Sequence, residues 1–181
     1  MVKLQKGDIL DSDAEALVNA VNCVGIMGKG LALLFKKAYP QNFKFYACAC
    51  EHGEVHLGSM LVYDLNRMTG PRYIINFPTK QHWKNQSRLE DIEAGLKDLV
   101  KTVRELHIQS IAIPPLGCGL GGLRWSDVRP RIEAAFEAVP ELRVALFEPS
   151  GAPEAARIVK QPKAREVQEQ QLPSRGSLRA D

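Results

Sequence analysis

Cysteine is scarce in this sequence, and no hydrophobic run is long enough to cross a bilayer. The N-terminal residues also lack the pattern of a signal peptide. The few cysteines are scattered in a way that is not typical of a disulfide framework. They are Cys23, Cys48, Cys50 and Cys118. We therefore expect a reduced, cytoplasmic protein without membrane spans.

Neither sign of charge is in large excess, and no internal repeat is visible. The formal net charge is +3 for 181 residues, which permits an anionic ligand without requiring nucleic acid. The apolar content of 45% is ordinary for a compact domain with a core of its own. From about Gly151 the chain becomes polar and has almost no apolar residue after Val167. We expect one domain over residues 1–150, followed by a polar tail or linker over 151–181 that is disordered or partly helical.

Short apolar runs alternate with amphipathic stretches along residues 1–150. The runs predict strands at 2–5, 16–21, 59–65, 72–77, 109–113 and 142–147. The amphipathic stretches predict helices at 31–37, 41–52, 87–106 and 127–139. This alternation is typical of an α/β fold with helices on both faces of a largely parallel sheet.

Finer signals mark the ends of these elements. Ser87 and Glu90 have the spacing of a capping box for the helix that follows. Apolar residues then recur along one face of that helix, at Ile92, Leu96, Leu99, Val103 and Leu106. Pro130 falls in the first turn of the helix expected from Asp127, where proline is tolerated. Pro78 is expected to end its strand, which would place Lys80 on a loop.

A glycine-rich loop, PPLGCGLGGL at 114–123, connects the strand at 109–113 to the last helix. Glycines let backbone N–H groups approach an anion, and the following helix adds its positive end. We interpret this loop as a phosphate or diphosphate cradle; the alternative is a flexible turn. The dinucleotide fingerprint also fits Gly117, Gly119 and Gly122, with Glu148 as its acid. However, the match lies late in the chain, only one strand follows it, and Glu148 is too distant.

A second glycine-rich turn, residues 22–30, follows the strand at 16–21. It is not a P-loop, because Gly30 and Cys23 stand where that motif needs Ser or Thr and Gly. A zinc site is another alternative, from Cys48, Cys50, His52 and His56. On a helix Cys50 points away from the other three, so we favour helix cysteines and predict no metal.

The segment from Phe77 to Lys84 carries the candidate reactive groups. Lys80 is either a solvated lysine or an amine desolvated beside Trp83, with a lowered pKa and a role as nucleophile or imine former. His82 is either its acid–base partner or a hydrogen-bonding residue of the loop.

Four motifs occur in an order that resembles the macrodomain family. They are Gly7-Asp8-Ile9, Asn19-Ala20-Val21-Asn22, Gly28-Lys29-Gly30-Leu31-Ala32 and the loop from Pro114 to Gly119. The resemblance covers about residues 1–150. It implies ADP-ribose binding on a three-layer α/β/α fold with a mixed, largely parallel central sheet.

Within that family, Phe77-Pro78-Thr79-Lys80-x-His82-Trp83 is similar to the branch of DNA ADP-ribosyl glycohydrolases and the terminal ADP-ribose protein glycohydrolase. The DNA enzymes are antitoxins that remove ADP-ribose from thymidine in single-stranded DNA and so reverse a DNA ADP-ribosyltransferase toxin. The resemblance implies a hydrolase of an N-glycosidic bond that needs no cofactor. It also implies a DarT-like toxin as partner, and we expect a monomer.

The resemblance also implies roles for individual residues. Asp8 accepts from the adenine amino group, Asn22 holds the distal ribose, and Lys80 is catalytic. The chain departs from the protein glycohydrolase in having no acidic residue in the late loop, so His82 or a group on the substrate would have to serve as the acid. The expected ADP-ribose contacts are Asp8, Ile9, Asn19, Asn22, Gly28, Lys29, Gly30, Leu31, Pro115, Leu116, Gly117, Cys118, Gly119, Leu120 and Gly121.

Contacts to DNA are expected from exposed cationic and aromatic side chains, with Trp83 available to stack on a base. They are Arg67, Trp83, Lys84, Arg88 and Arg124. Two other functions remain open: a non-catalytic ADP-ribose reader, and a macrodomain hydrolase acting on ADP-ribosylated protein or on O-acetyl-ADP-ribose.

Overall fold

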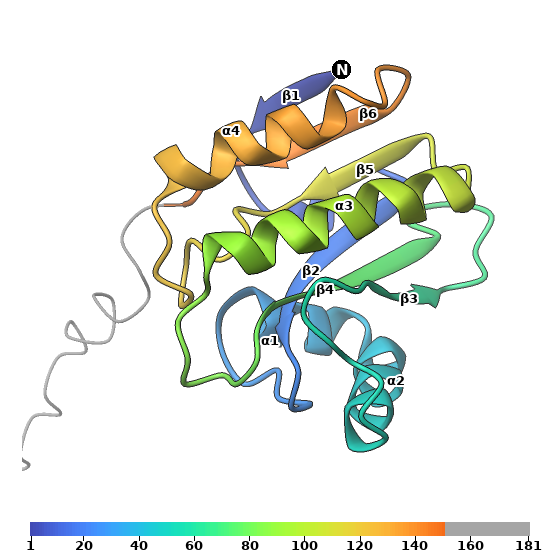
Figure 1. The fold of residues 1–181 in the computed structure, drawn as a ribbon. Coiled ribbons are helices and arrows are strands. Elements are labelled where there is room, and N and C mark those ends of the chain that lie inside the picture. Colours follow the sequence, from blue (N-terminus) through green and yellow to red (C-terminus); the bar gives the residue numbers. More distant parts are fainter. Residues whose placement is uncertain (151–181) are drawn as a thin grey trace, which may run out of the picture.

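The computed structural model describes residues 1–150, which form a six-stranded sheet covered by helices on both faces (Figure 1). The tail expected at 151–181 lies outside the described residues. The strands are β1 (Val2–Gln5), β2 (Ala16–Asn22), β3 (Leu61–Asp64), β4 (Tyr73–Lys80), β5 (Ser110–Ile113) and β6 (Arg143–Phe147). The helices are α1 (Gly30–Ala38), α2 (Pro40–Glu51), α3 (Leu89–Glu105) and α4 (Trp125–Phe136), and a short 3-10 helix covers Ile9–Asp11.

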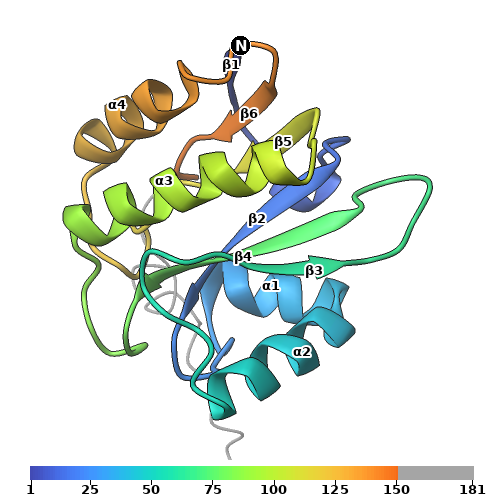
Figure 2. The same cartoon turned by 45° about the vertical axis from the view of Figure 1, so that its right-hand side comes forward.

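The strands lie in the order β1-β6-β5-β2-β4-β3, and only the edge strand β3 is antiparallel to its neighbour. Helices α3 and α4 cover one face of the sheet, and α1 and α2 cover the other (Figures 1 and 2). Parallel strands need crossover connections, and these helices supply them. The predicted α/β fold with a largely parallel sheet is confirmed.

The core explains why the central strands are apolar throughout. Successive strand residues point to opposite faces, so both faces of a covered strand are buried. Leu17 packs in the cluster of Phe35 from α1, whereas its neighbour Val18 packs in the cluster of Ile92 from α3. The predicted apolar stripe of α3 is confirmed, with only its last member, Leu106, half-buried.

Three local predictions are wrong. Strand β4 does not end at Pro78 but continues to Lys80, because the register shifts there and Asn22 pairs with Lys80 rather than with Thr79. Such a bulge accommodates a residue that has no N–H to donate. The capping box does not form, since Arg88 is the N-cap of α3 and makes no side-chain cap. Helix α4 begins at Trp125, so Pro130 lies beyond its first turn.

None of the helices within residues 1–150 is long and apolar enough to cross a bilayer.

Candidate active site

The carboxyl ends of three central strands meet at one edge of the sheet (Figure 1). Parallel neighbours β5, β2 and β4 end there at Ile113, Asn22 and Lys80. Open α/β sheets bind ligands at this edge, because the loops that leave the strands carry variable side chains and free backbone groups. Both glycine-rich loops start from it.

Asn22 shapes the early loop, residues 22–30. Its side-chain oxygen accepts from the Val24 N–H at 3.0 Å and from the Tyr46 hydroxyl at 2.8 Å. Its side-chain nitrogen donates to the Ile26 carbonyl at 2.7 Å. Burial raises the pKa of Tyr46, so its hydroxyl remains a donor. A contact from the Asn22 side chain to a ribose, as expected from the sequence, is limited to its second amide hydrogen.

The early loop ends in the N-terminus of α1, where the backbone donors are free. The N-cap Lys29 provides no side-chain cap. Among residues 1–150, the N–H groups of Gly30, Leu31 and Ala32 donate no hydrogen bond, and Leu33 is the first to do so, to the Lys29 carbonyl at 3.4 Å. Free donors and the helix dipole together favour an anion at this point.

The late loop, residues 114–123, is folded by its own backbone. Hydrogen bonds run from the Cys118 N–H to the Pro115 carbonyl at 3.0 Å and from the Leu123 N–H to the Gly117 carbonyl at 2.9 Å. Gly117 adopts φ +72°, a conformation that favours glycine. These turns leave the N–H groups of Gly119, Leu120 and Gly121 without a hydrogen bond in the described part of the chain. Such adjacent free amides form an anion-binding concavity.

The two loops and Lys80 converge on Leu120. The Lys80 amine donates to the Leu120 carbonyl over 3.4 Å. A Cβ added to Gly30, at the start of α1, would lie 3.6 Å from a methyl group of the Leu120 side chain. Residues 30 and 120, on loops far apart in sequence, therefore lie close together at Leu120, whose carbonyl contacts the Lys80 amine.

Partial burial lowers the pKa of Lys80, which raises the neutral fraction of its amine at a given pH. No salt bridge within residues 1–150 involves Lys80. The carboxylate that follows the late loop, Asp127, is bonded to Arg124 at 2.8 Å. Burial raises the pKa of the Cys118 thiol to about 11, so this thiol is protonated at neutral pH and is a poor nucleophile. Lys80 is therefore a candidate reactive group of this site.

His82 and Trp83 lie just beyond β4. The His82 Nδ1 accepts from the Lys84 N–H at 3.2 Å, so the proton of the neutral ring resides on Nε2. The Trp83 ring is 46% exposed, lies 5.3 Å from the His82 ring and has the Lys84 amine 5.0 Å from its centroid. An exposed aromatic face beside a cation can stack on a nucleic-acid base.

Other candidates for DNA contact differ in position or pairing. Arg88 and Arg124 are exposed but form ion pairs with Glu90 at 3.6 Å and with Asp127. Arg67 precedes β4 and therefore lies at the opposite edge of the sheet from Lys80, with its guanidinium 5.9 Å from the Tyr39 ring. The structure does not bring Arg67 to the site.

Asp8 lies after β1, at the same edge of the sheet as the loops. One of its carboxylate oxygens accepts from the Leu10 N–H at 2.9 Å, and the side chain is otherwise exposed. Ile9 is 3% exposed, so only its backbone is placed to contact a ligand. This arrangement suits recognition of an exocyclic amino group.

Two of the residues expected to contact the ligand have buried side chains. Asn19 is completely buried and donates to Asn76 at 3.3 Å, inside an amide cluster that also includes Asn42. Leu116 is also completely buried, which leaves only its backbone. Asn19 lies within β2, where side chains alternate between the two faces of the sheet, and its side chain points toward the helices. The early loop begins only three residues later, at Asn22.

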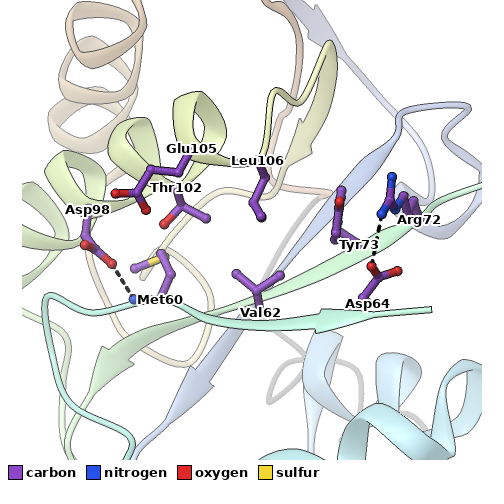
Figure 3. Close-up of a pocket in the computed structure, with 9 residues that line it drawn as sticks. All are labelled: Met60, Val62, Asp64, Arg72, Tyr73, Asp98, Thr102, Glu105 and Leu106. Atoms are coloured by element: carbon purple, nitrogen blue, oxygen red, sulfur yellow. Dashed lines mark hydrogen bonds and ion pairs between the residues drawn. The ribbon is translucent and has the colours of Figure 1, made fainter. Parts of the chain in front are cut away.

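No three His, Cys, Asp or Glu side chains of residues 1–150 come together as a metal site. The His52 ring contacts the Cys48 carbonyl at 2.8 Å within α2 and its C-cap. A groove of about 600 Å³ lies elsewhere, between β3, β4 and α3 (Figure 3).

Comparisons with known proteins agree with this geometry. A family model described as the Macro domain matches residues 18–132. The chain belongs to the macrodomain family. Among solved structures, this macrodomain is 52% identical to the macrodomain of Mycobacterium tuberculosis DarG, over 83% of this chain and 99% of that one, with a TM-score of 0.82. The family resemblance expected from the sequence is confirmed.

Two longer relatives are informative. A DNA ADP-ribosyl glycohydrolase from Thermus aquaticus is 51% identical over 88% of this chain, which spans 44% of that relative. A structure of Thermosipho africanus DarTG in complex with ADP-ribose is 34% identical, with a TM-score of 0.78, over 85% of this chain and 43% of that one. This macrodomain thus spans less than half the length of both relatives.

Proposed function

We propose that this macrodomain is a glycohydrolase that removes ADP-ribose from thymidine in single-stranded DNA. The observation that carries the proposal is the Lys80 amine, partly desolvated and in contact with the late loop beside the free N–H groups of both glycine-rich loops. Relatives named DNA ADP-ribosyl glycohydrolase, 51% and 52% identical, support the choice of substrate.

In the proposed complex the diphosphate lies between the two loops. Gly119, Leu120 and Gly121 donate backbone N–H groups from one side, and the N-terminus of α1 from Gly30 donates from the other. The free carboxylate oxygen of Asp8 accepts from the adenine amino group. The distal ribose then extends toward Lys80, which ends β4 opposite Asn22. The complex of Thermosipho DarTG with ADP-ribose supports this choice of ligand.

The reaction follows from a neutral amine placed at the anomeric carbon. The Lys80 nitrogen attacks that carbon, the bond to the thymine nitrogen breaks, and the thymine takes the bonding electrons and a proton. The lysine nitrogen loses a proton as the sugar ring opens to an imine. Water then adds to the imine and releases ADP-ribose and the free amine.

His82 is proposed to stabilise the departing thymine by a hydrogen bond, and the proton that thymine takes up is the one that the attacking Lys80 nitrogen loses. The His82 Nδ1 accepts from the Lys84 N–H, so Nε2–H is the donor of this hydrogen bond. The late loop between Leu116 and Leu123 contains no carboxylate that could serve instead. Trp83 and Lys84 are proposed to hold the DNA strand next to the modified nucleotide, with the base stacked on the indole.

A DarT-like toxin is the proposed functional partner, because it would attach to DNA the ADP-ribose that this macrodomain removes. A relative from Thermosipho africanus is named as a fusion of a DNA ADP-ribosyl transferase with a DNA ADP-ribosyl glycohydrolase. It is 38% identical over 71% of this chain, which spans 37% of the fusion. A monomeric state and a cytoplasmic location remain predictions from the sequence.

The test uses a thymidine oligonucleotide carrying ADP-ribose, an ADP-ribosylated protein, and the variants Lys80→Ala and Lys84→Ala. We expect release from DNA to fall at least about a hundredfold in Lys80→Ala, with ADP-ribose affinity within a few-fold of the wild type. Lys84→Ala also removes a lysine but keeps the reactive amine, so we expect it to weaken binding of the oligonucleotide, seen as a higher KM, and to leave kcat within a few-fold of the wild type. Binding of ADP-ribose without turnover of either substrate would indicate a reader, and release from protein alone would indicate a hydrolase of another specificity.

A further inference from the structure

Ser87 is a buried serine whose hydroxyl has no hydrogen-bond partner among residues 1–150. The residue is 6% exposed and lies between Lys80 and α3, immediately behind the late loop. Buried hydroxyls are nearly always paired, because an unpaired one loses its bonds to water without compensation. Ser87 does not cap α3, so helix capping does not account for this buried hydroxyl.

The Ser87 hydroxyl lies beside two glycines of the late loop, Gly117 and Gly121. A Cβ added to Gly121 would collide with the Ser87 hydroxyl oxygen and would lie 2.5 Å from the Gly117 carbonyl oxygen. A Cβ added to Gly117 would lie 3.3 Å from the same hydroxyl. The Ser87 N–H donates to the Gly121 carbonyl at 2.9 Å. The hydroxyl and the Gly117 carbonyl are therefore near neighbours that do not yet bond.

We propose that Ser87 is a positioning residue whose hydroxyl pairs with the Gly117 carbonyl when the late loop closes on an anion. The Gly117 carbonyl already accepts from Leu123 and has a second lone pair for this bond. The inference rests on the proposed function, since the anion is the diphosphate of ADP-ribose. In the free protein the unpaired hydroxyl disfavours the open loop, and ligand binding removes that cost.

This role gives Ser87 an effect on affinity that is opposite to its effect on stability. Ser87→Ala removes an unpaired polar atom, so the free protein unfolds at the same or a higher temperature. The same variant lacks the bond of the closed loop, and its affinity for free ADP-ribose falls about tenfold. Ser87→Cys has a side chain of similar size that is only a weak donor, so we expect its affinity for ADP-ribose to approach that of Ser87→Ala.

Ser110→Ala is the matched control. Ser110 is a similarly buried serine, 8% exposed, but its hydroxyl accepts from the Glu15 N–H at 2.9 Å, at the amino end of β5. We expect Ser110→Ala to lower the unfolding temperature and to leave the affinity unchanged. The experiment is calorimetry with free ADP-ribose and thermal unfolding on the wild type and the three variants.

The outcomes separate this inference from the proposed function. If the wild type does not bind ADP-ribose, the proposed function fails. If the wild type binds and Ser87→Ala binds equally well, the hydroxyl is not used in the closed loop and the inference is wrong. A Ser87→Ala variant that is destabilised as much as Ser110→Ala, or does not fold, shows a purely structural serine and also overturns it.

Discussion

The strand-end site and the groove beside β3 differ in how their polar groups are paired. In the groove, the Asp98 carboxylate accepts from the Met60 N–H at 2.7 Å, and Asp64 pairs with Arg72 at 3.3 Å (Figure 3). The Asn66 N–H and the Arg72 guanidinium lower the pKa of Asp64. At the strand ends, several backbone donors and the Ser87 hydroxyl make no hydrogen bond within residues 1–150.

Volume alone therefore does not identify a binding site in this structure. The groove is a hollow of about 600 Å³, yet its charged groups already stabilise the fold and have little left to offer a ligand. At the glycine-rich loops, by contrast, the free amides gain a partner only when an anion arrives. Substitutions in the loops should therefore change affinity, and substitutions in the groove should change stability.

The largest expected effect comes from Gly121→Ala. The added methyl group would meet the backbone carbonyl of Gly117 at 2.5 Å, which a side-chain movement cannot relieve, so the loop must change shape. We expect affinity for ADP-ribose, measured by calorimetry, to fall by about a hundredfold or more while thermal unfolding stays cooperative.

Gly119→Ala is the control for that change. A Cβ at Gly119 would have no neighbour within 4 Å, so the loop keeps its shape in the free protein. We expect a much smaller loss of affinity. Equal losses in both variants would mean that the loop geometry behind Gly121 has no special role.

The sequence predicts most of the architecture because hydrophobic period and glycine position are local signals. The buried strands and the stripe of α3 follow from side-chain spacing, and the two loops follow from their glycines. The burial of Asn19 does not follow from these local signals. Its motif also contains Asn22, but strand geometry turns Asn19 toward the helices, and only the fold shows that it is buried.

Two features of the site depend on contacts between distant segments. Ser87 has the sequence spacing of a helix cap, yet it packs against Gly117 and Gly121, which lie on another loop. Lys80 follows a proline that favours the end of a strand, but pairing with β2 extends the strand by a bulge. In both cases a tertiary contact overrides a local preference.

The next largest effect is the pH dependence of hydrolysis. Only the neutral Lys80 amine attacks carbon, and burial lowers its pKa, so kcat/KM should rise about tenfold per pH unit and level off above that lowered pKa. The measurement is a pH–rate profile with the ADP-ribosylated oligonucleotide. His82→Ala should lower the plateau of the profile and leave the rise that reports Lys80 in place. A profile that is flat or falls throughout with rising pH contradicts a nucleophilic amine.

The smallest effect on binding is expected from the groove. Asp98→Ala removes the acceptor of the Met60 N–H, which leads into β3, and should lower the free energy of unfolding by about 1 kcal/mol. ADP-ribose affinity should stay within about twofold, because no group of the strand-end site depends on this bond. Asp13→Ala, which breaks an exposed pair with Arg143, is the control and should change neither quantity measurably. If Asp98→Ala instead weakened ADP-ribose binding as strongly as Gly121→Ala, the groove would belong to the binding surface, and paired groups would no longer distinguish a structural hollow from a site.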